Sequence, residues 1–251
     1  MRTIVCGTFV LGLLLTAGLR LQADDQADAK KIIDKAIKAE GGDEKLAKYK
    51  AATSKGKGTI HIGGNDIEFT FDAAVQPPKQ SRRHFEADVG GTKFERTIVF
   101  NGDKGWISMM GNTDELSPDQ LAAEREDMHA TWVATLEPLK DPSFKLAPLG
   151  EIKVGDRPAV GVKVSQKDHK DVNLYFDKDS GLLLKLQRRA KDTMSGQEVD
   201  QETFYSDYKA ENGMMRARKQ KTKRDGNDFL DLEITEFKPA ERLDDSLFAK
   251  P

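Results

Sequence analysis

The feature that most constrains the fold is a repeated alternation of apolar and polar residues, interrupted by short turn sequences. Residues 172–189, VNLYFDKDSGLLLKLQRR, show this pattern most clearly. The apolar positions of one face are Val172, Leu174 and Phe176 before the turn, and Leu182, Leu184 and Leu186 after it. A period of two is typical of a half-buried β-strand, and Asp179-Ser180-Gly181 suits a tight turn. The sequence therefore predicts a β-hairpin here.

Similar stretches recur along most of the chain. They are residues 59–62, 67–71, 94–100, 105–109, 144–146, 160–164, 202–208, 214–221 and 229–237. Glycine and asparagine, which tolerate positive φ, stand at the connections, for example in Gly63-Gly64-Asn65, Asn212-Gly213 and Asp225-Gly226-Asn227. Strands joined by such short turns are antiparallel, because parallel strands need long crossover segments. We therefore expect a mainly β domain built as an antiparallel meander.

A first helical region lies near the N-terminus. Within residues 28–38, apolar side chains recur with helical spacing at Ala29, Ile32, Ile33, Ala36 and Ile37. The pair Gly41-Gly42 would end this helix, and Asp43 would cap a short second helix that reaches about Tyr49. Helix is therefore expected in residues 27–50.

A second helical region is expected in residues 117–137. Ser117, Pro118 and Gln120 provide an N-cap, a first-turn proline and a capping-box partner. One face of this helix then carries Leu121, Met128, Trp132 and Leu136, as far as Pro138.

So few helices cannot cover the apolar face of about ten strands, and a large antiparallel sheet tends to curl into a trough. Burying a large apolar side chain gains roughly 1.5–3 kcal/mol, so an open apolar trough favours the binding of a hydrophobic ligand. Candidate ligand-binding residues are Phe69, Phe71, Phe100, Trp106, Met128, Trp132, Leu174, Phe176 and Leu184. The alternative is that these residues are simply core. On the ligand hypothesis, the Ser117 helix acts as a movable plug over the trough.

The N-terminus predicts export. Met1-Arg2 is positive, residues 4–18 are almost wholly apolar, and Ala23 is a small residue at which a signal peptidase can cut. We expect a signal peptide in residues 1–23 and a single domain in residues 24–251, in the periplasm or another extracytoplasmic space. Cys6 precedes the apolar segment, which does not fit a lipid-attachment site. The cleaved protein would contain no cysteine, which excludes disulfides and a thiol nucleophile.

Catalytic patterns are weak, and neither a cofactor nor a metal is expected. The histidines His61, His84, His129 and His169 are scattered. The segment 177–181, DKDSG, resembles the start of a calcium loop, but its glycine comes one position early and no glutamate closes the loop. Carboxylates are abundant, so a hydrolase remains a less favoured alternative. Acidic residues slightly outnumber basic ones, 42 against 40, which argues against a nucleic-acid partner.

Residues 216–224 form a basic stretch, RARKQKTKR. Its cations are Arg216, Arg218, Lys219, Lys221, Lys223 and Arg224. They could bind an envelope protein or an anionic surface. Alternatively they lie on a solvated strand, where their charge prevents edge-to-edge pairing.

Several segments carry a family resemblance: AKKIIDKAIKAEGGDEKLAKYK, KGKGTI, FNGDKGWI, VNLYFDKDSGLLLKLQRR, ETFYSDYKAENG and LDDSLFAKP. Together they resemble the outer-membrane lipoprotein-sorting proteins of the LolA/LolB-like group, and most closely its uncharacterised members from planctomycete-type bacteria. The resemblance implies an open, unclosed antiparallel β-barrel (a half-barrel) of about eleven strands, with helices in its concave face. In the true carriers, that concave face receives lipoprotein acyl chains.

These observations favour an exported, non-enzymatic binding protein that holds an acyl chain, a lipid or a lipidated protein in a concave hydrophobic face. The alternative is an envelope sensor or protein-interaction module whose helices pack the trough completely. An unfilled apolar trough favours the first hypothesis and a fully packed one the second.

Overall fold

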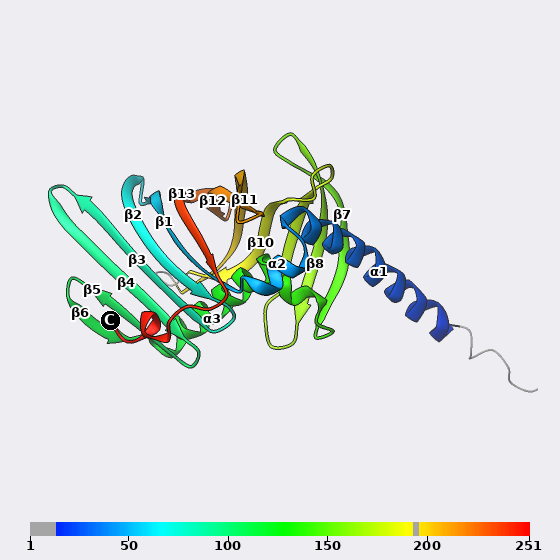
Figure 1. Cartoon of the computed structure of the whole chain (residues 1–251), viewed down its shortest axis with the longest axis horizontal. Coiled ribbons are helices and arrows are strands. Elements are labelled where there is room, and N and C mark those ends of the chain that lie inside the picture. The colour runs from blue at the N-terminus through cyan, green and yellow to red at the C-terminus, as the bar shows by residue number, and fades with distance from the viewer. Residues whose placement is uncertain (1–13, 193–195) are drawn as a thin grey trace, which may run out of the picture.

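The computed structural model describes residues 14–192 and 196–251. Its strands are β1 (Ala51–Ile62), β2 (Asn65–Gln76), β3 (Gln80–Val89), β4 (Thr92–Asn101), β5 (Lys104–Met109), β6 (Asn112–Glu115), β7 (Phe144–Val154), β8 (Arg157–Gln166), β9 (Val172–Asp177), β10 (Leu183–Lys191), β11 (Glu198–Glu211), β12 (Met214–Arg224) and β13 (Asn227–Ala240). All lie in one antiparallel sheet with the order β6-β5-β4-β3-β2-β1-β13-β12-β11-β10-β9-β8-β7 (Figure 1). The edge strands β6 and β7 do not pair with each other, so the half-barrel is open, as predicted.

The number of strands is thirteen in the described residues rather than about eleven. The sequence pattern missed β3 and β6. Strand β3 places Arg83 toward a helix and Arg82 toward the opposite face, so it lacks an alternation of apolar and polar residues. Strand β6 has only four residues, Asn112–Glu115, and all of its side chains are polar.

The helices are α1 (Leu14–Glu40), α2 (Asp43–Lys48), α3 (Pro118–Ala134) and two 3-10 turns, η1 (Glu137–Lys140) and η2 (Asp245–Phe248). Both expected helical regions are confirmed, but α1 begins at Leu14 instead of near residue 27, and the C-terminal turn η2 was not expected. The capping box of Ser117 and Gln120 is confirmed. The predicted Asp43 cap is wrong, because Gly42 occupies the N-cap position and Asp43 is already helical. Leu136 lies beyond the end of α3, in a left-handed conformation with φ 63°.

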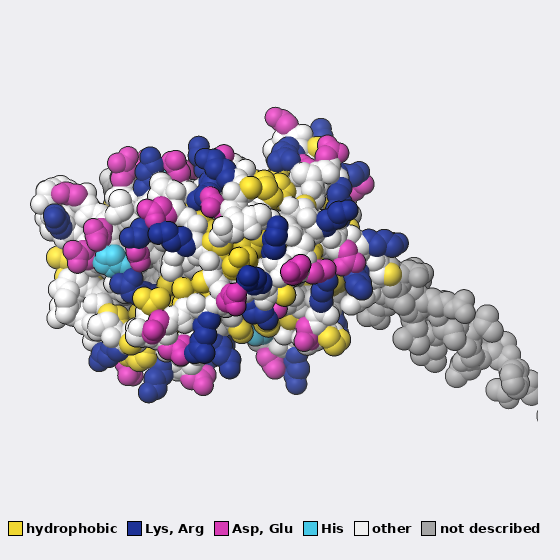
Figure 2. Space-filling view, in the orientation of Figure 1, with side chains coloured by type: hydrophobic (Ala, Val, Ile, Leu, Met, Phe, Trp, Pro, Cys, Tyr) yellow, Lys and Arg dark blue, Asp and Glu magenta, His cyan; other side chains and the backbone are white. Residues whose placement is uncertain are grey.

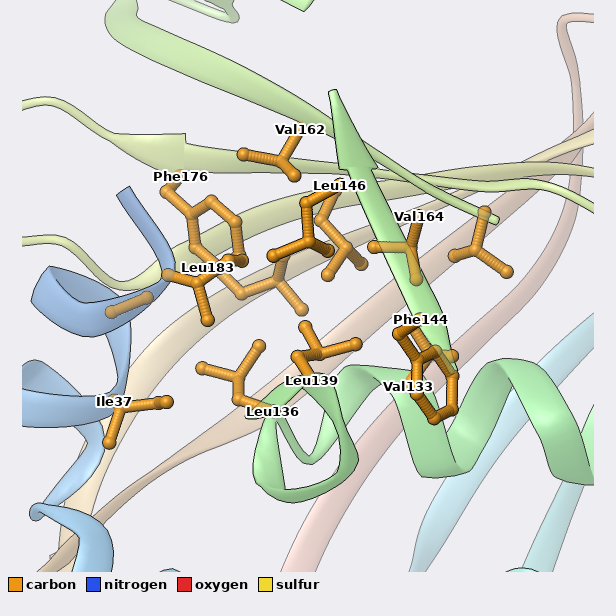
Figure 3. Close-up of a cluster of buried hydrophobic side chains, with 14 of the residues drawn as sticks. Ile37, Val133, Leu136, Leu139, Phe144, Leu146, Val162, Val164, Phe176 and Leu183 are labelled. Atoms are coloured by element: carbon orange, nitrogen blue, oxygen red, sulfur yellow. The ribbon is translucent and has the colours of Figure 1, made fainter. Parts of the chain in front are cut away.

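The main core lies on the helix side of β7 to β10. Helix α1 contributes Ala29, Ile33 and Ile37, and α3 with η1 contributes Val133 and Leu139. Figure 3 shows Ile37, Val133 and Leu139 on the helix side of Leu146, Val162, Val164, Phe176 and Leu183 of the sheet. α1 has most of its sheet contacts with β7, followed by β8 and β12. The helices therefore pack mainly over β7–β10, and α3 continues across the concave face to β3 and β4.

The C-terminal turn η2 lies on the opposite face of the sheet. Phe248 is fully buried against Ala74 of β2 and Val99 of β4. Arg83 pairs with Glu124 of α3, so Ile98, which lies opposite Arg83, also faces α3. Val99 follows Ile98 along β4 and therefore faces the other way, toward η2.

The predicted signal peptide, residues 1–23, lies partly outside the described residues, and α1 begins within it. Its cleavage stays a prediction. None of the described helices has the length and apolar composition needed to cross a membrane.

Candidate functional site

The part of the concave face over β1 and β11–β13 that the helices do not fill contains a cavity of about 310 Å³, here called the inner cavity. Its walls come from β1, β2, β11, β12 and β13, from the end of α1, from the residues after α2, and from the last turn of α3. Its lining residues are Glu40, Tyr49, Lys50, Ala51, Ala52, Ser54, Val75, Pro77, Thr131, Ala134, Thr135, Leu183, Tyr205, Tyr208, Met214, Met215, Arg216, Ala217, Gln220, Ile234, Phe237 and Pro239.

The lining of the inner cavity is mainly apolar or uncharged. Among the described residues that line it, the charged ones are Glu40, Lys50 and Arg216. Its volume falls at the lower end of the range of roughly 300–1,000 Å³ that is typical of small-molecule pockets. This size suits one hydrocarbon chain better than several.

Glu40 and Arg216 form an ion pair at the wall of the inner cavity. Glu40 is the last residue of α1, and its side chain is almost fully buried at 5% exposure, whereas that of Arg216 is 19% exposed. Arg216 Nη1 donates a hydrogen bond to Glu40 Oε2 over 2.7 Å. Burial raises the pKa of Glu40 to about 7, although Arg216 opposes this shift. The carboxylate is therefore poorly compensated by its one partner.

Two tyrosines of β11 face the same space. Tyr208 donates its hydroxyl hydrogen to the Leu183 carbonyl oxygen over 2.6 Å. Tyr205 packs against the main core, and its hydroxyl has no hydrogen-bond partner among the described residues. Burial raises the pKa of both phenols, so both remain neutral donors near pH 7.

Helix α3 spans the concave face and is bound on two sides. Glu124 forms a salt bridge with Arg83 of β3, and Asp127 forms one with Arg188 of β10. Burial raises the pKa of Glu124 even though Arg83 lies beside it. The two ion pairs hold α3 between distant strands of the sheet.

An aromatic row lies on the same face of β2 and β3. The Phe69 ring centroid is 5.5 Å from that of Phe85 and 6.5 Å from that of Phe71. The facing residues of β1 are Gly56 and Gly58. A Cβ at Gly58 would lie 2.6 Å from Phe69 Cζ, so only glycine lets the ring lie over β1.

A second cavity of about 980 Å³, the outer cavity, lies at β1–β4 and β11–β13. Charged side chains predominate in its lining, among them Lys57, Glu68, Glu233 and Lys219. Gln220 lines both cavities. The outer cavity is larger, but its charged lining suits an acyl chain less well than the lining of the inner cavity.

The structure divides the nine predicted ligand-binding residues among several places. Leu174, Phe176 and Trp132 join the main core under the helices. Phe100 and Met128 are buried, at 2% and 4% exposure. Phe69 and Phe71 belong to the aromatic row. None of the nine lines the inner cavity, although Trp132 lines a small adjacent cavity of about 50 Å³.

Trp106 and Leu184 do not share the concave face. Trp106 pairs with Val99 and packs in the cluster of η2. Leu184 packs with Tyr175, which lies between Leu174 and Phe176 and so faces away from the main core. A register shift between β9 and β10, from Leu183 to Lys185, places Leu183 instead of Leu184 under the helices. The simple alternation of the sequence could not show this shift.

The basic stretch forms β12, an interior strand between β11 and β13, so the expectation of an aggregation-blocking edge is wrong. Acidic neighbours pair with most of its cations. The pairs are Arg216–Glu40, Arg218–Glu211, Lys221–Asp228, Lys223–Asp228 and Arg224–Asp192. Figure 2 shows basic and acidic side chains intermixed over the visible face. Binding of an anionic surface through this stretch stays a prediction.

The DKDSG segment is a turn rather than a calcium loop. Asp177 accepts hydrogen bonds from the backbone N–H groups of Asp179 and Ser180, and it pairs with Arg157 over 2.9 Å. Among the residues that the structure describes, no group of three or more His, Cys, Asp or Glu side chains is placed to hold a metal ion.

Sequence reasoning missed Glu40 and Tyr205. The position of Glu40 could have been noticed in the sequence, because it follows Ala36 by four residues and Ile33 by seven and so lies on the apolar stripe of α1. A carboxylate on such a stripe must find a buried partner. The partner, Arg216, is 176 residues away and could not be identified from spacing.

Solved structures with the same fold support the resemblance seen in the sequence. They include a LolA superfamily protein from Nitrosomonas europaea (14% identity, TM-score 0.57) and a DUF1329 family protein from Desulfovibrio piger (15% identity, TM-score 0.56). A third is described as an outer membrane lipoprotein-sorting protein domain, from Vibrio parahaemolyticus (11% identity, TM-score 0.55). Each comparison covers 88% of this chain and 97% of the other. No protein-family model and no curated sequence matches the chain.

Proposed function

We propose that this chain, which has the fold of the LolA superfamily, is a binding protein that holds one acyl chain of a lipid or lipidated protein in its inner cavity. The observation that carries the proposal is the incomplete filling of the trough. The helices pack over β7–β10, while a mainly uncharged cavity of about 310 Å³ stays open over β1 and β11–β13. A fully packed core, as an interaction module would have, does not leave such a space.

The apolar wall of the cavity provides the binding energy. Val75 from β2 and Ile234 and Phe237 from β13 line it together. Covering apolar surface gains roughly 25 cal/mol per Å², so a hydrocarbon chain in contact with these walls is stabilised without any specific polar contact. Binding, and not catalysis, is the activity that this lining supports.

Export belongs to the same proposal. Cleavage near Ala23 leaves Ala29, Ile33, Ala36 and Ile37 of α1 and the core that they form in place. We therefore expect the mature protein to begin at about residue 24 and to fold normally. Intact mass analysis of the secreted protein checks this expectation. A mature chain that still carries Met1, or an acylated Cys6, would contradict it.

Blocking the inner cavity tests the binding proposal. Ser54 lines the cavity from β1, and the next residue, Lys55, faces away from it and pairs with Asp72. Ser54→Phe should fill the space, whereas Lys55→Phe adds the same ring to the opposite face. Each protein is purified from the cells that make it, and retained lipid is measured by native mass spectrometry and solvent extraction.

The expected result is one retained acyl lipid in the wild type and in Lys55→Phe, and none in Ser54→Phe. Circular dichroism confirms that both variants are folded. If folded wild-type protein retains no lipid and takes up none on addition, the interaction-module hypothesis replaces the proposed function.

A further inference from the structure

The inner cavity contains hydrogen-bond donors that its own residues do not fully use. Arg216 carries five N–H donors. Its Nη1 contacts Glu40 and, at 3.4 Å, the Met215 carbonyl oxygen, while Nη2 meets only the Met214 sulfur at 3.4 Å. Thioether sulfur is a weak acceptor. The guanidinium therefore has capacity left on the side that lines the cavity.

Tyr205 adds a second donor to the same cavity. Its hydroxyl has no partner among the described residues, in contrast to the hydroxyl of Tyr208. The Tyr205 hydroxyl lines the cavity without a protein partner, so a bound acceptor can take its hydrogen bond in place of water. Arg216 and Tyr205 thus present one positive charge and one neutral donor beside an apolar wall.

We infer that the inner cavity recognises a single-chain carboxylic acid, with the carboxylate held by Arg216 and Tyr205 and the hydrocarbon chain along Val75, Ile234 and Phe237. This inference rests on the proposed function and names its ligand class. A carboxylate matches the planar fork of a guanidinium. Arg216 shares its charge with Glu40, and the other cation of the lining, Lys50, pairs with Glu137 over 3.0 Å. The cavity therefore suits a singly charged head group better than a doubly charged phosphate ester.

Glu40 competes with the ligand for Arg216. In the free protein it neutralises Arg216, and when a ligand carboxylate arrives, Glu40 takes up a proton so that the buried charges stay balanced. The other titratable groups around the site are Tyr49, Lys50, Tyr205, Tyr208 and Arg188, the last beside Tyr205. α3 contributes only Thr131, Ala134 and Thr135. Because the pKa of Glu40 is raised to about 7, affinity for a carboxylate should fall as the pH rises from 6 to 8.

Calorimetric titration with dodecanoate and with dodecan-1-ol separates head-group recognition from chain binding. The wild type should bind the acid at least about tenfold more tightly than the alcohol at pH 6.5, because charge-assisted hydrogen bonds are the stronger ones. Arg216→Gln should bind both ligands equally. Lys219→Gln is the matched control, since Lys219 is an exposed cation on the same strand and lines the outer cavity.

Arg216→Gln leaves Glu40 without its partner and can disturb folding, so Glu40→Gln provides an independent test. This variant should bind dodecanoate several-fold more tightly than the wild type at pH 8 and should lose the dependence on pH. Tyr205→Phe should weaken binding of the acid more than binding of the alcohol.

The outcomes distinguish the two proposals. Three results would contradict the carboxylate site but leave acyl-chain binding intact. They are equal affinity of the wild type for acid and alcohol, weaker binding of the acid by Glu40→Gln than by the wild type, and loss of the preference for the acid in Lys219→Gln but not in Arg216→Gln. If neither ligand binds, the proposed function itself fails.

Discussion

The buried His129 and the partly exposed His169 form a stacked pair that the sequence did not reveal. Their rings stack at a centroid distance of 3.9 Å with an interplanar angle of 10°. His169 Nδ1 lies 2.9 Å from Glu126 Oε1. Burial lowers the pKa of His129 to about 4, and the nearby charges of His169 and Arg188 add to this effect, against Glu126.

This shift predicts a loss of stability in acid. An unfolded histidine takes up a proton near pH 6.5, whereas folded His129 resists protonation until about pH 4, so protons favour the unfolded chain as the pH falls through this window. His129→Phe keeps an aromatic ring against His169 and removes the titration. We expect the wild type to lose on the order of 1 kcal/mol more than this variant between pH 7 and pH 5.

Urea unfolding at each pH measures the difference. Thr131→Ala, an exposed change on the same helix, should follow the wild type throughout. If the free energy of unfolding of the wild type and of His129→Phe falls in parallel with pH, His129 is not the cause of the loss of stability in acid.

At the scale of single residues, the spacing of residues in the sequence predicted a side-chain interaction only when the two partners were close in sequence. Ser117 and Gln120 are three residues apart, and their capping box is confirmed. His129 and His169 are 40 positions apart in the sequence, and only the packing of α3 against the segment after β8 brings them together. Long-range pairs of this kind depend on the register of the whole sheet.

At the scale of elements, α3 depends on its two ion pairs with the sheet. Arg83→Gln leaves the carboxylate of Glu124 without its partner, and the side chain of Glu124 is only 13% exposed. Because an unpaired, largely buried charge is costly, we expect a loss of about 1–3 kcal/mol in the free energy of unfolding. The double variant Arg83→Gln/Glu124→Gln should recover most of it.

Arg82→Gln is the matched control for this prediction. Arg82 is the neighbouring arginine of β3, and it faces the other way, toward the half-exposed Asp72 at 3.3 Å. Exposed pairs contribute about 0–1 kcal/mol, so this change should be nearly neutral. Chemical denaturation of the three variants measures these changes in the free energy of unfolding. Equal losses at Arg82 and Arg83 would show that the ion pair does not hold α3.

The same two arginines explain why β3 escaped prediction. The segment QSRRHFEADV carries charged residues on both faces, because one face meets α3 and the other meets η2 and solvent. In contrast, β9 and β10 lie under the helices, and their apolar alternation identified them directly. A strand can be predicted from sequence alternation when its buried face packs against apolar groups.

At the scale of the whole molecule, turn chemistry and alternation were enough to predict an open antiparallel sheet. The turns at Gly63-Gly64 and Asp225-Gly226 have the positive φ values expected of hairpins. Sequence could not show which half of the trough the helices fill. That outcome depends on the packing of α1 against β7 and β8, at one edge of the sheet (Figure 1).

Binding of one acyl chain in the inner cavity is tested most directly through Trp132. This side chain lines the small cavity that shares Tyr49, Lys50, Pro77, Thr135 and Arg216 with the inner cavity. Trp106→Phe removes the other tryptophan, which lies on the opposite face. The emission of Trp132 is then followed during titration with octanoate, dodecanoate and hexadecanoate.

The emission should change and saturate at one chain per protein, with affinity rising by about 0.8 kcal/mol for each added methylene until the cavity is full. Adding Ser54→Phe should abolish the change. Flat emission with all three acids, together with no binding at micromolar concentration by calorimetry, would contradict an acyl-binding role for this protein.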